Sequence, residues 1–361
     1  MARIKTARGR LGWREFLLSL FLIVVVWVGR KFINSPSDSG IVLESDTLGA
    51  IDVLFTSQQT EADTSVADEL GMAIAGAQSS VDLAVYDLAL EQIADALVDA
   101  HSRGVSVRLV TETDYEDEAA LRQIQRAGIP VVADSGDPLM HNKFVVVDRE
   151  QVWTGSWNLT YNGTYRNNNN VVVVHSPRLA ENYTAEFEEM FVQAQFGSGS
   201  PDDGTPYPYL ELDGVVVETL FAPEDDVRAR VLELVSEAQE SISFMAFAFT
   251  DDEIARSLVQ KSRTGLNVQG VLETRTAEDR GAEFAFFQQS GVDVRLDGNP
   301  YMMHHKVMVI DEHIVVTGSY NFTRSAAERN DENVLIIRDA GIAARYVEEF
   351  QHVYQMAEEA R

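Results

Sequence analysis

The sequence predicts an α/β fold built from two tandem lobes, preceded by an N-terminal hydrophobic helix. Three observations predict this fold. A stretch of about 160 residues occurs twice, strand and helix patterns alternate within each copy, and one long apolar run stands near the amino terminus. A repeat of that length indicates a duplicated domain, because solenoid units are roughly 20 to 50 residues long. We expect two α-β-α lobes related by a pseudo-two-fold axis, each with a mixed or largely parallel sheet between helices.

The apolar run FLLSLFLIVVVWVG, residues 16–29, is followed directly by the basic residues Arg30 and Lys31. It is short for a membrane span of about 20 residues, but long basic side chains at its ends can reach the interface. We expect residues 16–31 to be a transmembrane anchor or a signal segment, after a short basic cytoplasmic tail at 1–15. A clear small-residue cleavage site is missing, which favours the anchor over a cleaved signal peptide. The flanking basic and polar residues disfavour a third interpretation, a buried helix of a soluble domain.

The distribution of charge predicts where the chain lies and what it binds. More positive charge precedes the apolar run than follows it, so the tail should stay inside and the acidic body outside the cytoplasm. The alternative is secretion after signal cleavage. The whole chain has 29 Lys and Arg against 57 Asp and Glu, a net charge of −28, which disfavours nucleic acid as a partner. The chain has no Cys, which excludes disulfides, thiolate metal sites and a Cys nucleophile.

The elements of the two halves follow one order. The first half begins at Ala77 with a strand, a helix, a glycine turn and a second strand, in AQSSVDLAVYDLALEQIADALVDAHSRGVSVRLVTET. A helix (EDEAALRQIQRAG), a short strand (IPVVAD), the strand HNKFVVVD, a strand ending in TGS, the β-rich NVVVV and a closing amphipathic helix (ENYTAEFEEMFVQA) come next. The second half repeats this order from Ala238 and ends with the helix AARYVEEFQHVYQMA.

The repeat and a linker-like composition define the segments of the chain. GSGSPDDGTPYPY has the Gly, Pro, Ser and Asp content of a connection between domains. Besides the tail and the apolar segment, we expect a linker at 32–48, a first lobe at 49–196, a linker at 197–213 and a second lobe at 214–361. Because both lobes lie in one chain, we expect a monomer that forms an intramolecular pseudo-dimer.

Two motifs stand at equivalent points of the halves, HNKFVVVD at 141–148 and HHKVMVID at 304–311. His and Lys two positions apart on a strand point to the same side. Each motif is followed at the same spacing by a second one, GSWNLT or GSYNFT. Lys is rare after residue 31, and two of the three remaining lysines stand in these motifs. Together the motifs supply His141, Lys143, Ser156 and Asn158 from the first half, and His304, Lys306, Ser319 and Asn321 from the second.

These residue types suit the chemistry of a phosphodiester. Lys and Asn can donate hydrogen bonds to the non-bridging oxygens of a phosphate, with Ser and a turn amide in reserve. One imidazole can attack phosphorus, while the other protonates the leaving oxygen and then deprotonates water. The sequence has no HExxH motif and no carboxylate cluster with metal-ligand spacing, so we expect no metal and no cofactor.

The doubled H-x-K-x4-D and G-S-x-N pattern resembles the signature of the phospholipase D superfamily, over roughly residues 50–358. The resemblance implies phospholipase D-type lobes with one active site at their interface, a covalent phosphohistidine intermediate and no metal. It implies that the catalytic residues are His141, Lys143, Asn158, His304, Lys306 and Asn321. Asp148 and Asp311 match the motif Asp, which we interpret as structural support, and Ser156 and Ser319 match the small residue near the phosphate.

The two halves depart from each other at one supporting position. Members of the superfamily usually have an acidic residue about a dozen positions after G-S-x-N, where it orients a catalytic His. Glu332 fits this pattern in the second half, but Asn169 stands at the equivalent point of the first. An amide can accept a hydrogen bond from an imidazole N–H but does not stabilise imidazolium as a carboxylate does. The sequence therefore leaves open which of His141 and His304 is the nucleophile and which is the acid.

Three reactions compete for this site. Hydrolysis of a phospholipid to phosphatidic acid is favoured by the predicted membrane segment, and it makes a phospholipid or membrane surface the expected partner. A nuclease is favoured by G-S-x-N followed by [LF]-T, which resembles the nuclease-like branch of the superfamily, but the net charge disfavours it. Phosphatidyl transfer ranks third, because cardiolipin synthases usually have two membrane helices and an Asp where Thr160 and Thr323 stand. An inactive binding protein is disfavoured because all six core polar residues are present.

Overall fold

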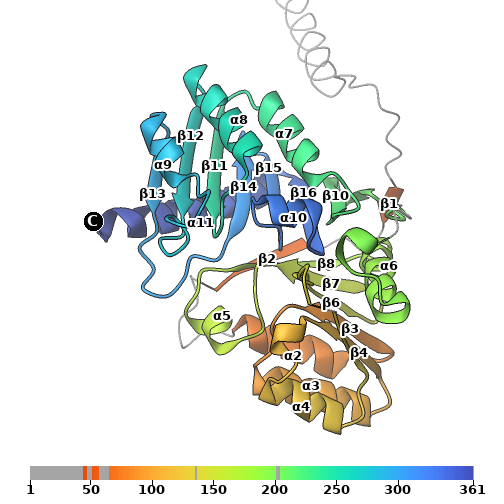
Figure 1. Cartoon of the computed structure of the whole chain (residues 1–361). Helices are drawn as coiled ribbons and strands as arrows, with labels where there is room; N and C mark the ends of the chain where they lie inside the picture. Colours follow the sequence, from red (N-terminus) through yellow and green to blue (C-terminus); the bar gives the residue numbers. More distant parts are fainter. Residues whose placement is uncertain (1–43, 47–50, 57–64, 135, 201–203, 361) are drawn as a thin grey trace, which may run out of the picture. The chain divides into compact units, whose positions relative to one another are not determined.

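Two mixed β-sheets organise the protein, each covered by its own set of helices (Figure 1). The structure is a computed structural model, and it describes residues 44–46, 51–56, 65–134, 136–200 and 204–360. This arrangement confirms the predicted α/β fold with two sheets.

The first sheet has seven strands in the order β2-β8-β7-β6-β3-β4-β5. Its strands are β2 (Ile51–Phe55), β3 (Ser80–Val85), β4 (Ser106–Thr111), β5 (Val131–Ala133), β6 (Lys143–Val147), β7 (Gln151–Gly155) and β8 (Asn170–His175). Its helices are α2 (Val66–Gly76), α3 (Glu91–Ser102), α4 (Ala119–Arg126), α5 (Tyr161–Tyr165) and α6 (Pro177–Gln193). Strands β3, β4 and β5 run parallel because helical crossovers connect them, and the other neighbours are antiparallel.

The second sheet repeats this topology and extends it. Its order is β1-β9-β10-β16-β15-β14-β11-β12-β13. Its strands are β1 (Glu44–Asp46), β9 (Tyr209–Leu212), β10 (Val215–Ala222), β11 (Ser241–Ala246), β12 (Asn267–Leu272), β13 (Asp293–Leu296), β14 (Lys306–Ile310), β15 (Ile314–Gly318) and β16 (Glu332–Arg338). Its helices are α7 (Val227–Glu237), α8 (Asp252–Arg263), α9 (Phe284–Gln289), α10 (Arg324–Glu328) and α11 (Ala340–Glu359).

Strands β1 and β9 lie in segments that the sequence predicted to be linkers. Strand β1 pairs in parallel with β9, and β9 pairs antiparallel with β10, so both extend one edge of the second sheet. In β9 the apolar residues Leu210 and Leu212 alternate with polar ones and are fully buried. The surrounding Gly- and Pro-rich composition hid this short alternation from the sequence analysis.

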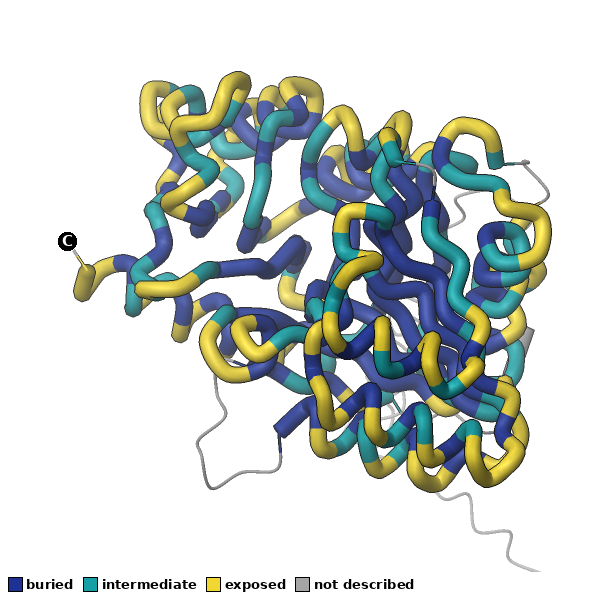
Figure 2. The backbone as a smooth tube through the Cα atoms, turned by 60° about the horizontal axis from the view of Figure 1, so that its bottom comes forward, coloured by how far each residue is buried: buried dark blue, intermediate teal, exposed yellow. Residues whose placement is uncertain are grey.

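Three hydrophobic clusters hold the layers together. One lies between the first sheet and α2 to α4, and a second lies between the second sheet and α7 to α9. The third takes residues from both sheets and from the closing helices α6 and α11, including Tyr183, Phe187, Tyr346 and Phe350. Figure 2 shows the buried strands enclosed by helices whose outer turns are exposed. Because the third cluster joins both sheets, the two lobes share one core.

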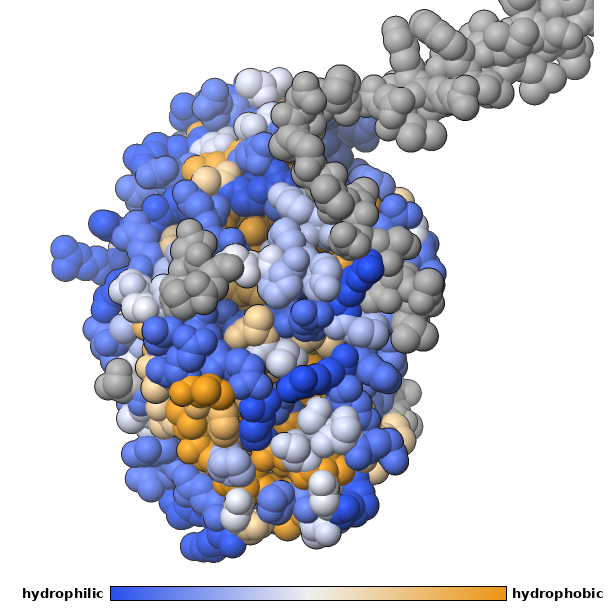
Figure 3. All heavy atoms as spheres, turned by 90° about the vertical axis from the view of Figure 1, so that its right-hand side faces the viewer, coloured by the Kyte–Doolittle hydropathy of each residue, from blue (hydrophilic) through white to orange (hydrophobic). Residues whose placement is uncertain are grey.

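The surface is largely polar. Hydrophilic residues predominate on the face that Figure 3 shows, with smaller apolar patches among them. Within the described ranges, no helix has the length and apolar character needed to cross a bilayer. The predicted N-terminal hydrophobic helix and anchor at 16–31 lies outside these ranges and stays a prediction.

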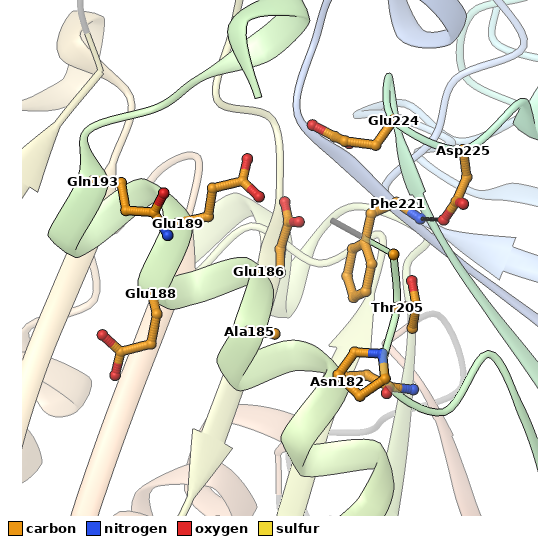
Figure 4. A pocket seen from close by; sticks show the side chains of 12 residues that line it. Asn182, Ala185, Glu186, Glu188, Glu189, Gln193, Thr205, Phe221, Glu224 and Asp225 are labelled. Atoms are coloured by element: carbon orange, nitrogen blue, oxygen red, sulfur yellow. Dashed lines mark hydrogen bonds between the residues drawn. The ribbon is translucent and has the colours of Figure 1, made fainter. Parts of the chain in front are cut away.

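A pocket of about 250 Å³ rich in carboxylates lies between α6 and the connection from β10 to α7. In Figure 4, Glu186 and Glu189 project from α6 toward the segment that holds Glu224, whereas Glu188 points away from it. None of the described residues that line this pocket is basic. Burial, followed by nearby carboxylates, raises the pKa of Glu224 to about 7 and holds the pKa of Glu186 well above its usual range.

These raised pKa values predict that stability depends on pH. A carboxyl with a raised pKa keeps its proton in the folded state while the unfolded chain loses it, so stability falls as pH rises between the two values. For Glu224 that interval runs from about 4.3 in the unfolded chain to about 7 in the folded protein. We expect Glu224 to lower the free energy of unfolding by roughly 1 kcal/mol per pH unit between pH 5 and 7, a contribution that denaturant titration gives as the difference between the wild type and Glu224→Gln.

A matched pair of variants tests the origin of that slope. Glu224→Gln should flatten the pH dependence, because an amide does not titrate. Glu188→Gln is the control, because in Figure 4 the Glu188 side chain points away from Glu224, so its loss should leave the contribution of Glu224 unchanged. Equal slopes in the wild type and Glu224→Gln would contradict the assignment.

Candidate active site

The two His–Lys strands enter the interface between the lobes side by side with loops of the opposite lobe. The backbone N–H of His141 donates to the carbonyl of Asp331 at 3.0 Å, and the N–H of His304 donates to the carbonyl of Asn168 at 2.9 Å. The flanking residues form short parallel bridges across the lobes. The structure therefore brings the two predicted motifs together at one place.

A buried hydrogen bond across the lobes orients His141. Its Nδ1 lies 2.7 Å from Oε2 of Glu332, which stands at the start of β16 in the second lobe. The hydroxyl of Ser319 donates to the same carboxylate oxygen at 2.6 Å. Burial raises the pKa of Glu332 to about 8, and the nearby lysines and Ser319 act against this rise. His141 is 7% exposed and Glu332 is fully buried, so solvent does little to weaken their interaction.

An amide takes the equivalent place beside His304. Nδ1 of His304 lies 2.9 Å from Oδ1 of Asn169 and 3.0 Å from the carbonyl of Ser156. Asn169 donates from Nδ2 to the carbonyl of Gly163 at 2.9 Å, and its Oδ1 accepts from the Ser156 hydroxyl at 3.0 Å. These bonds fix the amide oxygen toward the imidazole. Because both neighbours of Nδ1 are acceptors, the Nδ1 of His304 holds a proton and its Nε2 is left for chemistry.

This crossed arrangement changes the meaning of the departure at Asn169. The supporting residue about a dozen positions after each G-S-x-N motif, Asn169 or Glu332, accepts a hydrogen bond from the His of the other lobe. The change from an acidic residue to Asn169 therefore affects His304, whereas His141 has a carboxylate partner in Glu332. Ser156 and Ser319 are fully buried and hold Asn169 and Glu332 in place.

The two motif lysines lie in matching environments. Nζ of Lys143 donates to the carbonyl of His141 at 2.8 Å and lies 4.8 Å from the centre of the Tyr86 ring. Nζ of Lys306 donates to the carbonyl of His304 at 2.9 Å and lies 4.7 Å from the centre of the Phe247 ring. Both rings also meet the adjacent imidazoles edge-on, at 4.8 and 4.7 Å between centroids.

Burial strongly perturbs these basic groups. It lowers the pKa of Lys143 to about 7 and holds the pKa of Lys306 well below its usual value. Burial and the two lysine charges also hold the pKa of His141 and of His304 well below the usual imidazole range. Four basic side chains thus share a poorly solvated space, where an anion would be strongly favoured.

The remaining predicted residues divide into two groups. Asn158 and Asn321 are half-buried, and in the described part of the chain their buried amide oxygens have no hydrogen-bond partner. Asp148 and Asp311 instead lie at the far ends of β6 and β14. Each accepts hydrogen bonds from three successive backbone N–H groups, at 78–80 or 239–241 respectively. Their position makes them scaffold residues distant from the two histidines.

A polar layer that could not be predicted from the sequence joins the two lobes next to the site. Asn170 donates to Thr317 at 2.7 Å and to Tyr346 at 3.0 Å, both in the other lobe. Asn333 makes the reciprocal bonds, accepting from Thr154 at 2.5 Å and donating to Asn142. The available signal was a polar residue opening each apolar run, in NVVVV and NVLII. Its meaning depended on the partner lobe, which the sequence does not show.

The turn glycines make this close approach of strands possible. Gly155 and Gly318 both have φ 148°. A Cβ on Gly155 would lie 2.2 Å from the carbonyl oxygen of Asn170, and one on Gly318 would lie 2.1 Å from that of Asn333. Only glycine allows the strands to approach so closely beside the site.

Comparison with known proteins identifies related chains. The family described as cardiolipin synthase, PLD-like domain, matches residues 70–191 and 231–354. A phospholipase D of Rickettsia prowazekii is 33% identical over 142 residues, which are 39% of this chain and 69% of that protein. Human mitochondrial cardiolipin hydrolase is 30% identical over 127 residues, which are 35% of this chain and 50% of that protein.

A solved structure extends the likeness to both lobes. The phosphatidylserine synthase of Haemophilus influenzae Rd KW20 superposes with a TM-score of 0.65 over 85% of this chain and 86% of that one. The sequences are 15% identical, so this likeness shows the fold alone. The family match, in contrast, covers both His–Lys motifs and more than half of the chain. We conclude that the chain belongs to the phospholipase D superfamily.

Proposed function

We propose that this protein hydrolyses phospholipids at the bond between phosphate and head group, releasing phosphatidic acid through a phosphohistidine intermediate. The chain is a phosphodiesterase-type hydrolase. The observation that supports the proposal is the crossed pairing of His141 with Glu332 and of His304 with Asn169, beside two buried lysines. Relatives described as phospholipase D and cardiolipin hydrolase favour a lipid substrate.

In this mechanism His141 is the nucleophile. Its Nδ1–H donates to Glu332, which leaves the Nε2 lone pair free to attack phosphorus. The Nε2–P bond forms as the bond from phosphorus to the head-group oxygen breaks. The imidazole ring gains positive charge in this step. That charge favours the ionised form of Glu332, whose pKa is about 8 in the free protein, and the carboxylate then offsets the charge as the triad Asp does beside a catalytic His.

His304 acts as the acid and then as the base. Its Nε2 gives a proton to the departing head-group oxygen, and later takes one from water. That water forms the new P–O bond while the Nε2–P bond to His141 breaks, which restores the enzyme. Asn169 orients the ring without adding negative charge, so the imidazolium of His304 is weakly stabilised and gives up its proton readily.

Lys143, Lys306, Asn158 and Asn321 are the proposed ligands of the non-bridging oxygens. Burial lowers the pKa of both lysines in the free protein. A bound phosphate would place a negative charge beside them and so favour their protonated, charged form. We also propose that residues 49–196 and 214–361 act as the two lobes of one site in a monomer. Residues 16–31 would anchor this body outside the cytoplasm.

The reaction product distinguishes a lipid hydrolase from a nuclease. In excess EDTA, the full chain should release phosphatidic acid from phosphatidylcholine vesicles, because no step of the proposed mechanism uses a metal. Single- and double-stranded nucleic acid, offered in parallel, should stay intact. His141→Ala is the inactive control. Cleaved nucleic acid together with intact lipid would overturn the lipid assignment in favour of the nuclease.

Variants of the two histidines distinguish the nucleophile from the acid. His141→Ala and His304→Ala should each lower kcat on natural lipid by about 10³-fold or more. With an activated p-nitrophenyl phosphodiester, whose leaving group needs no proton, His304→Ala should still form the phosphohistidine and accumulate it. Peptide mass spectrometry should find the adduct on His141. An adduct on His304 in the His141→Ala variant would reverse the assigned roles.

The residue beside His304 should set the pH dependence of kcat. A carboxylate beside an imidazole favours the charged form, so Asn169→Asp should raise the pKa of His304. Because His304 must be protonated to act as the acid, the alkaline limb of the kcat profile should move up by about one pH unit. Ser156→Ala, which removes the hydroxyl but no charge, is the control. A shift of the acidic limb instead would identify His304 as the group that must be unprotonated.

A further inference from the structure

Two corners of the molecule occupy equivalent positions beside the active site. One consists of α5 and the loop 297–303, and the other of α10 and residues 136–140. Each corner adjoins one motif, because each loop runs directly into a His–Lys strand of one lobe and each helix follows a G-S-x-N motif of the other. In Figure 1, α5 and the connection from β13 to β14 lie on the same side of the molecule.

The α10 corner has the ordinary chemistry of a soluble surface. Arg324 pairs with Glu328 at 2.7 Å, and Arg329 pairs with Asp137 across the lobes at 2.7 Å. Its exposed cations thus have carboxylate partners on the protein itself.

The α5 corner has aromatic rings instead. Tyr161, Tyr165 and Tyr301 are 58, 48 and 43% exposed, which makes them three of the five most exposed large apolar side chains in the described ranges. The guanidinium of Arg166 lies 5.0 Å from the centre of the Tyr161 ring and 4.9 Å from that of Tyr301. Within the described part of the chain Arg166 makes no ion pair, and its polar contact is to the amide oxygen of Asn162 at 3.0 Å.

We name Tyr161, Tyr165, Arg166 and Tyr301 the tyrosine–arginine corner. It is joined rigidly to the active site. Asn299 donates to the carbonyl of Arg166 at 3.0 Å and also to the side chain of Asn168. The carbonyl of Asn168 in turn accepts from the backbone N–H of His304 at 2.9 Å.

The fold does not require these tyrosines. Tyr161 and Tyr165 stand where α10 has Arg324 and Glu328, and Tyr301 stands where the other loop has Pro138. The equivalent corner forms the same helix and turn without aromatic rings. Three large exposed rings gathered at one edge of the site therefore indicate a surface that is covered in use.

We propose that the tyrosine–arginine corner docks on the surface of a zwitterionic phospholipid bilayer and holds the active site at the level of the head groups. This inference rests on the proposed function and extends it to the physical form of the substrate. Tyrosine suits the bilayer interface because its ring enters the apolar boundary while its hydroxyl stays hydrated. The uncompensated guanidinium of Arg166 can bind a lipid phosphate.

Charge selects among the possible occupants of the corner. The chain has a net charge of −28, which repels anionic bilayers and nucleic acid alike. Single-stranded nucleic acid could stack on the rings, but its affinity depends on many phosphate contacts along a basic groove. The corner offers one Arg. A zwitterionic bilayer has little net charge, so aromatic insertion can dominate the binding.

The absence of cysteine from the chain provides a direct test. Asn162→Cys places a single thiol on the exposed face of α5, beside the corner but on none of its four residues. Ser325→Cys places one at the equivalent exposed position of α10 and is the matched control. Each full-length variant is labelled with a polarity-sensitive fluorophore and mixed with phosphatidylcholine vesicles or with a 20-residue oligo(dT).

With vesicles, the label at 162 should become two- to threefold brighter and shift to the blue, while the label at 325 should not respond. Tyr161→Ser with Tyr301→Ser should remove the response at 162. Equal responses at 162 and 325 would overturn the proposal. They would mean that the protein contacts the vesicles through some other segment and that the α5 corner is not the docking surface. A response at 162 to oligo(dT) but not to vesicles would also overturn it, in favour of nucleic acid.

Activity on two physical forms of one lipid keeps this proposal separate from the proposed function. The Tyr161→Ser, Tyr301→Ser protein should hydrolyse monomeric dihexanoyl phosphatidylcholine within twofold of the wild-type rate, and the same head group in vesicles about tenfold more slowly. Equal loss on both forms would make the tyrosines part of the site and overturn docking. A wild type that hydrolyses neither form, yet shows the response at 162, would overturn the proposed function and leave docking supported.

Discussion

The hydrogen bond between His141 and Glu332 sets the requirement that the rest of the structure meets. Its two residues come from different lobes, so the bond exists only if the two sheets keep one relative position to within a fraction of an ångström. The shared central core, the closing helices α6 and α11 and the reciprocal bonds of Asn170 and Asn333 all fix that position. The glycines of the TGS turns allow the strands to come close enough.

The same geometry makes the free protein electrostatically unfavourable at its centre. Two lysines and two histidines are buried together. Burial lowers the pKa of all four groups, and the lysine charges lower the pKa of both histidines further. The carboxylate pocket behind α6 shows the opposite case, with crowded acids that retain protons. The folded protein tolerates both because the surrounding clusters stabilise it. Such preorganised, poorly solvated charge is what an anionic transition state requires, since little reorganisation remains to be done during the reaction.

The overall fold and the identity of the polar residues could be predicted from the sequence, because both repeat. Two copies of one strand and helix order predict two similar sheets, and two copies of a His–Lys strand predict one shared cluster. The pairing within that cluster could not be predicted. Whether Asn169 serves His141 or His304 depends on how the loops after β7 and β15 cross between the lobes, which is a tertiary property. Strand β9 was missed for a local reason, since Gly and Pro around it outweighed the alternation of four residues.

The fusion of the two lobes in one chain has a consequence for how the site can change. In a symmetric homodimer every substitution appears twice, so both sides of a shared site must keep the same residues. Here the two halves are encoded separately within one chain, so a substitution in one half leaves the equivalent residue of the other unchanged. Two examples near the site are Asn169, where the second half has Glu332, and Tyr161, where the second half has Arg324. Covalent duplication thus allows the two halves to diverge at equivalent positions, which the proposed division between a nucleophilic and an acidic histidine requires.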